Sequence, residues 1–145
     1  MTVIVVDASV ALAWVLEDTA QAHLYAAQVA GAKLTGNQQL IAPALMWHEC
    51  AYRLLKLGRA KRWGEAKTAE YGETIDYFGI EYIDVSMTVA GLVRFATRRH
   101  VQGYDALYLA LALSTGASLA TLDGGLKTAA RAAGVPLFTA PAVAP

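Results

Sequence analysis

Cysteine is nearly absent from this chain, since Cys50 is the only one among 145 residues. A single cysteine excludes an internal disulfide and fits a reducing compartment, so we expect a cytoplasmic protein. Long apolar runs are missing as well, because none reaches the roughly 18 residues of a membrane-spanning helix. The start also lacks a basic segment followed by an apolar one, so no secretory signal is predicted. We therefore expect no membrane partner.

Charged residues are few, at 17% of the chain against about 25% in an average protein. Apolar residues make up 56%, so we expect a partner protein or a second copy to cover part of the surface. The 12 basic and 12 acidic residues cancel, which gives no sign of a strongly basic nucleic-acid binder. The length suits one domain, predicted over residues 1–140, followed by a short loose tail over 141–145.

Strand-like and helix-like stretches alternate along the chain. The first is a run of Val and Ile at residues 3–6, typical of a strand buried on both faces. Further strands are predicted at 40–42, 80–85, 118–122 and 135–139. Helices are predicted at 8–16, 59–78, 104–113 and 124–133. Three more are predicted from their end signals: one from a cap at Asp18 to Gly31, one from Pro43 to an end at Gly58, and one that begins after a cap at Ser86. This alternation predicts an α/β fold, a sandwich with helices on both faces of a mostly parallel sheet.

Three aspartates stand at the ends of predicted elements. Asp7 directly follows the first strand, Asp123 follows the strand at 118–122, and Asp105 begins the most apolar helix of the chain. A helix cap or a turn explains each of them equally well when it is taken alone, because aspartate is favoured at such positions. Their individual roles therefore stay open.

A fourth acid, Glu49, lies within the largely apolar helical stretch LMWHECAYRLL. An ionised carboxylate there is costly unless it is paired or solvated. An ion pair with Arg53, one turn further on, is the simplest explanation and contributes about 0.2–0.5 kcal/mol. His48 is not predicted as a metal ligand, because no second histidine lies near it in the sequence.

Together the four acids form a stronger pattern than any of them alone. Because the carboxyl ends of parallel strands share one edge of a sheet, the four side chains are expected to converge there. Neighbouring carboxylates raise one another's pKa, and a divalent cation removes this conflict. Ligands that are all oxygen favour Mg²⁺, with Mn²⁺ as a substitute, and such a metal activates water and stabilises a phosphoryl group. With these four acids set aside, 12 basic groups face eight acidic ones, a balance that attracts a polyanion.

Four stretches carry a resemblance to a known family: VVDASVALAW, PALMWHECAYRLL, YDALYLALAL and TLDGGLKTAARAAGV. Together and in this order they resemble the PIN domain, and among PIN domains the VapC-type toxins of bacterial toxin–antitoxin pairs. The resemblance covers nearly the whole chain and implies a PIN-like fold and a Mg²⁺-dependent endoribonuclease. It also implies a protein that is often dimeric and that a cognate VapB-like antitoxin silences by laying its tail over the active site.

The resemblance assigns roles to six residues. The four acids resemble the family's catalytic metal ligands: Asp7, Glu49, Asp105 and Asp123. Asp105 matches the main ligand, whereas the acid that Asp123 matches varies in place across the family. Ser9 resembles the hydroxyl residue that supports Asp7, and Thr121 resembles the hydroxyl companion of Asp123.

Basic residues gather around the Gly58 turn: Arg53, Lys56, Arg59, Lys61 and Arg62. Four of these are candidates for RNA contact: Arg53, Lys56, Arg59 and Arg62. The alternative is that they complement the helix macrodipole and keep the surface soluble.

Other classes of protein share parts of the acidic pattern. A haloacid-dehalogenase-like phosphatase also has an aspartate after its first strand, but it needs a second acid two residues later, where this chain has Ser9. A response-regulator receiver needs paired acids early and a phosphate-binding lysine late, and Lys127 lies within a predicted helix. A non-catalytic module that binds metal or RNA also remains an alternative.

Overall fold

The computed structural model describes residues 2–140, so the tail predicted over 141–145 lies outside it. Within the described part, strands and helices alternate as predicted. The strands are β1 Val3–Val6, β2 Gln39–Pro43, β3 Glu81–Ile83 and β4 Ser118–Ala120. The helices are α1 Ala8–Ala13, α2 Ala20–Leu34, α3 Leu45–Ala60, α4 Glu65–Tyr77, α5 Val89–Arg99, α6 Asp105–Thr115 and α7 Gly124–Ala132. The predicted α/β fold is confirmed.

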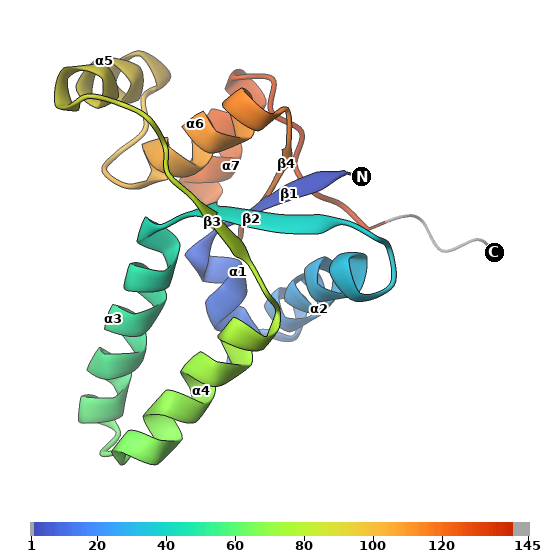
Figure 1. Cartoon of the computed structure of the whole chain (residues 1–145), viewed down its shortest axis with the longest axis vertical. Helices are drawn as coiled ribbons and strands as arrows, with labels where there is room; N and C mark the ends of the chain where they lie inside the picture. Colours follow the sequence, from blue (N-terminus) through green and yellow to red (C-terminus); the bar gives the residue numbers. More distant parts are fainter. Residues whose placement is uncertain (1, 141–145) are drawn as a thin grey trace.

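The strands form one sheet in the order β3-β2-β1-β4, and all of its pairings are parallel. β1 lies inside the sheet, and Ile4, Val5 and Val6 are fully buried. Burial of such a side chain contributes roughly 1.5–3 kcal/mol, which explains why this short strand anchors the core. Helices α1 to α4 lie on one side of the sheet and α6 and α7 on the other (Figure 1).

The carboxyl ends of β1, β2 and β4 lie at the same edge of the sheet, because these strands are parallel. The β1–β4 ladder continues one residue beyond β1, where the Asp7 amide donates to the Ala120 carbonyl at 3.0 Å. Thr121 follows β4, and α3 begins directly after β2. The topology therefore brings the segments that carry the predicted acids to one edge.

Helix α3 continues past Gly58, where the sequence predicted its end. Gly58 is buried against α4, and a Cβ built on it would lie 2.7 Å from Thr68 Oγ1. The Thr68 hydroxyl is held in place because it donates to the Gly64 carbonyl at 3.0 Å. Gly58 therefore allows a close approach of α3 and α4 and does not cap a helix.

Replacing Gly58 tests this close approach. We expect Gly58→Ala to lower the free energy of unfolding by about 1–3 kcal/mol, because the stiff, β-branched Thr68 cannot move away freely. Gly31→Ala in α2 is the matched control, since no atom lies within 4 Å of the added Cβ and the helix gains up to about 1 kcal/mol. Urea unfolding measures both changes. A Gly58→Ala protein as stable as the wild type, or no recovery in Gly58→Ala/Thr68→Ala, would contradict the packing argument.

Several predicted helix boundaries are wrong. Pro43 ends β2 and does not open α3. Thr19 and Thr88, not Asp18 and Ser86, cap α2 and α5, and each threonine oxygen accepts an amide from the first turn. The cap must stand directly before the helix because only there can it reach the free amides.

Several predicted elements are shorter than expected. The helix predicted at 8–16 ends at Ala13, and the strands predicted at 80–85 and 118–122 are Glu81–Ile83 and Ser118–Ala120. The helix predicted over 59–78 is divided at residues 61–64, where Arg62 has a positive φ of 56°. The strand predicted at 135–139 is a single parallel bridge between Leu137 and Leu119. Pro136 lacks an amide proton, so it cannot extend the ladder.

Helix α5 has no buried residue, although Val89, Leu92, Val93 and Ala96 stand at the spacing of a core-facing helix. Val89 and Val93 are 85% and 59% exposed. Figure 1 shows α5 beyond α6, away from the sheet. Its apolar face is thus open at these two valines in the part of the chain that the structure describes, whereas Phe95 packs against the core. Among residues 2–140, no helix combines the length and the hydropathy that crossing a bilayer requires.

Candidate functional site

The four predicted acids line a single cavity of about 480 Å³. They come from the end of β1, from α3, from the start of α6 and from the turn after β4: Asp7, Glu49, Asp105 and Asp123. Two cations of α3, Arg53 and Lys56, line the same cavity. Carboxylates therefore outnumber cations by four to two, and the cavity favours a positively charged occupant.

Asp7 is held chiefly by hydroxyl groups. Its Oδ2 accepts hydrogen bonds from Ser9 Oγ at 2.7 Å and from Thr121 Oγ1 at 2.8 Å. It stands at the N-cap position of α1, but its side chain makes no capping hydrogen bond, so the capping interpretation is wrong here. The side chain is only 6% exposed. This burial raises its pKa, the two hydroxyls and the backbone of Ala8 act in the opposite direction, and the Asp123 carboxylate raises it further.

Both supporting hydroxyls are fixed by backbone amides of the turn after β4. The amide of Leu122 donates to Ser9 Oγ, and the amide of Asp123 donates to Thr121 Oγ1, each at 3.0 Å. An amide can only donate, so each hydroxyl proton is free to point at Asp7. The structure thus places Ser9 and Thr121 where they orient the Asp7 carboxylate.

Glu49 is paired with a tyrosine hydroxyl and not with Arg53. Tyr108 donates from its hydroxyl to Glu49 Oε1 at 2.6 Å, and Arg53 is not among the groups that shift the pKa of Glu49, so the expected ion pair is wrong. Partial burial raises the pKa of Glu49, the tyrosine bond lowers it, and the Asp7 carboxylate raises it further. Tyr108 is fully buried, and burial with the nearby acids raises its pKa, so its hydroxyl stays a proton donor.

Asp105 and Asp123 differ in their surroundings. Burial, followed by the carboxylates of Asp123, Asp7 and Glu49, raises the pKa of Asp105 to about 6. Asp105 is the first residue of α6, and the capping interpretation is wrong for it, because the residue before it holds the cap position. For Asp123 the capping interpretation holds, since its Oδ2 accepts the Leu126 amide at 2.8 Å. The Leu126 amide uses one lone pair of Oδ2, so acceptor sites of this carboxylate remain for the cavity.

The chemistry of this donor set fits Mg²⁺ or Mn²⁺. The cavity offers carboxylate oxygens whose charges are costly without a cation, as the raised pKa values of Asp7, Glu49 and Asp105 show. Among the described residues, however, no three acidic, histidine or cysteine side chains are close enough together to form a ready metal cage. Mg²⁺ does not need one, because it usually keeps several waters and binds through one or two carboxylates.

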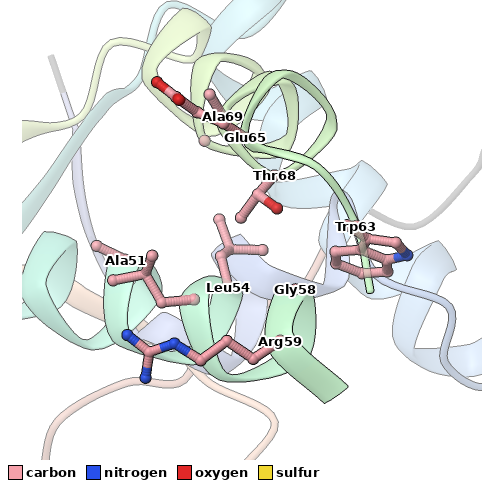
Figure 2. Close-up of a pocket in the computed structure, with 10 residues that line it drawn as sticks. Ala51, Leu54, Gly58, Arg59, Trp63, Glu65, Thr68 and Ala69 are labelled. Carbon is pink, nitrogen blue, oxygen red and sulfur yellow. The ribbon is translucent and has the colours of Figure 1, made fainter. Parts of the chain in front are cut away.

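The predicted basic cluster divides between two places. Arg53 and Lys56 line the acidic cavity, whereas Arg59 lines an apolar groove of about 470 Å³ between α3 and α4. Figure 2 shows this groove, with Leu54 and Trp63 among its walls. Arg62 lines neither of them. The four cations predicted to contact RNA therefore do not line one cavity.

Three tyrosines at the site were not singled out from the sequence. Tyr108 stands three residues after Asp105, a spacing that puts the two on one helix face and could have revealed it. Tyr52 and Tyr104 line the acidic cavity and are 72% and 62% exposed. No pattern in the sequence distinguishes these two from other surface aromatics.

Removing the Tyr108 hydroxyl tests how Glu49 is held. In Tyr108→Phe the ring still fills the core, but Glu49 loses the hydrogen bond that lowers its pKa. We expect Mg²⁺ affinity to fall about 10- to 100-fold, as for other partners of metal ligands, and the acid side of the binding profile to move to higher pH. Calorimetric Mg²⁺ titration across pH measures both, with exposed Tyr77→Phe as control. Unchanged affinity and profile would show that Tyr108 only packs.

Comparisons with known proteins agree on the fold. The family model of the PIN domain matches residues 4–132. No curated protein matches this sequence. Among solved structures, PAE2754 from Pyrobaculum aerophilum is 22% identical with a TM-score of 0.61, over 88% of this chain and 86% of its own. VapBC2 from Rickettsia felis, bound to a DNA fragment from their promoter, is 16% identical with a TM-score of 0.63. This match covers 94% of this chain and 98% of that one.

Proposed function

Because this chain belongs to the PIN domain family, we propose that it is a Mg²⁺-dependent endoribonuclease that hydrolyses RNA phosphodiester bonds. We further propose that it acts in the cytoplasm as the toxin of a type II, VapBC-like toxin–antitoxin pair. One observation carries the catalytic proposal: four carboxylates from separate elements line one cavity together with two cations. The fold likeness to a toxin–antitoxin complex supports the biological role.

The proposed chemistry divides among the residues of the cavity. Asp7 and Asp105 would hold the metal, with Glu49 and Asp123 beside them, and the bound metal would supply an activated water and stabilise charge on the phosphoryl group. Ser9 and Thr121 keep the Asp7 carboxylate oriented through their hydrogen bonds. Arg53 and Lys56 lie where they would contact phosphates next to the bond that is cut.

A cleavage assay with defined RNA ends tests the catalytic proposal. We expect the purified protein to cut single-stranded RNA in Mg²⁺ or Mn²⁺ and to stop when the metal is chelated. Attack by water should leave 5′-phosphate and 3′-hydroxyl ends, whereas attack by the RNA's own 2′-hydroxyl would leave cyclic phosphates. Metal-independent cleavage, or cyclic ends, would contradict the proposal. Trapping of an aspartyl phosphate would favour the phosphatase alternative. RNA binding without cleavage would favour the non-catalytic module.

The exposed apolar surfaces support the proposed antitoxin and homodimer. The open face of α5 and the groove between α3 and α4 are both candidate surfaces for burial against another chain. We expect light scattering at micromolar concentration to give a mass above the monomer, and the product of the adjacent gene to raise the unfolding temperature. A monomer that gains no stability from that product would contradict both partners.

A further inference from the structure

A second cavity, of about 320 Å³, adjoins the acidic one. Its charged lining consists of three cations and one acid: Arg53, Lys61, Lys67 and Glu17. Arg53 lines both cavities, so they meet at this side chain. The charge balance changes sign where they meet, from an excess of carboxylates to an excess of cations. We call this second cavity the basic cavity.

Both cavities follow the same two segments of the chain. Along the first, Leu12 of α1 lines the acidic cavity, and Val15 and Leu16 just after α1 line the basic one. Along α3, Lys56 lines the acidic cavity and Leu57 the basic one. From Glu49 to Lys61 a helix advances on the order of 18 Å, so the basic cavity extends the site away from the sheet edge.

The basic cavity is also lined by aromatic rings. The rings of Trp63 and Tyr71 lie 4.9 Å apart, and both residues line the cavity. Lys67 Nζ lies 5.3 Å from the centre of the Trp63 ring, which favours a fixed position for this cation. Cations beside aromatic faces are the usual lining of sites for single-stranded nucleic acid.

We propose that the basic cavity is a backbone subsite for single-stranded RNA, binding phosphates of the segment next to the one that is cut in the acidic cavity. This inference rests on the proposed nuclease function, because the ligand is the same RNA. It replaces part of the predicted contact set, since Lys61 and Lys67 take the place of Arg59 and Arg62. The continuity of the two cavities through Arg53 favours RNA over an acidic peptide, because the strand that enters the acidic cavity to be cut would continue into the basic one.

The test compares cations that are neighbours in sequence but differ in place. Lys61→Gln and Lys67→Gln each remove one charge from the basic cavity, while Arg62→Gln removes a charge that lines neither cavity. The probe is a short fluorescein-labelled single-stranded RNA of mixed sequence, bound by the full chain in chelator so that it stays intact. Anisotropy is measured over a range of salt, and cleavage of the same RNA is measured separately in Mg²⁺.

We expect each lysine variant to flatten the dependence of log affinity on log salt by about 0.7, the value for one lost phosphate contact on a single strand. Arg62→Gln should keep the wild-type slope. Equal slopes for all variants, with wild-type binding and cleavage intact, would overturn the subsite and leave the proposed function standing. A wild type that neither binds nor cuts RNA would overturn both. Loss of polyglutamate binding in the lysine variants, without loss of RNA binding, would assign the cavity to an acidic peptide instead.

Discussion

Asp7→Asn is expected to abolish metal-dependent RNA cleavage while the protein remains folded. The asparagine side chain has the same size, and its carbonyl oxygen can accept the hydroxyls of Ser9 and Thr121 in place of Oδ2. The charge, however, is gone, and with it the ligand on which the proposed metal site depends. Loss of a residue that only hydrogen-bonds to a metal ligand lowers metal affinity or activity about 10- to 100-fold. Loss of the ligand itself should therefore lower the rate of cleavage by about 100-fold or more.

The stability of Asp7→Asn separates the proposed role from a structural one. Burial raises the pKa of Asp7, so its ionised form is costly in the metal-free protein. We therefore expect the free energy of unfolding without metal to stay equal or to increase, and the gain in stability on adding Mg²⁺ to shrink. Asp76→Asn, which changes an exposed acid of α4, is the matched control. Equal cleavage rates for Asp7→Asn and wild type at matched folded concentration would remove Asp7 from the site.

The order of the elements was predictable because it depends on local patterns. The Val and Ile run of β1 and the apolar α6 are both continuous in the sequence, and burial of those side chains dominates the folding energy of each element. Parallel pairing then follows from the alternation, and with it the shared edge that holds Asp7 and Asp123. This is why the fold, and the position of the acids at one edge of the sheet, could be predicted from the sequence.

The family resemblance pointed to Ser9 and Thr121 as supporting hydroxyls, but the residues themselves did not reveal which acid each distant partner contacts. Tyr108 reaches Glu49 across 59 residues of sequence, and Thr121 reaches Asp7 across 114. The same limit applies to Gly58, whose burial depends on Thr68 of the next helix. The basic cluster shows this limit most clearly, since Lys61 lines the basic cavity whereas its neighbour in sequence, Arg62, lines neither cavity.

The pH dependence of stability should reveal Asp105 in the metal-free protein. Its pKa is raised from 3.8 to about 6 in the folded state, so between these values the folded protein binds more protons than the unfolded one. The free energy of unfolding must therefore fall as pH rises through this window. Asp105→Asn removes the group, and we expect this variant to show a flatter profile over the same range. Urea unfolding in chelator at a series of pH values measures the slope.

Mg²⁺ should reverse this behaviour, because a bound cation favours the ionised carboxylate. Protons and metal compete for Asp105, so Mg²⁺ affinity should fall as pH drops below about 6, approaching a tenfold loss per pH unit for a single competing proton. Burial raises the pKa values of Asp7 and Glu49 as well, so their protonation acts in the same direction. In saturating Mg²⁺ the wild type should no longer lose stability between pH 4 and 6. A metal-free slope of opposite sign would show that the pKa of Asp105 is not raised in the folded protein. Mg²⁺ affinity that ignores pH in this range would show that Asp105 is not a ligand.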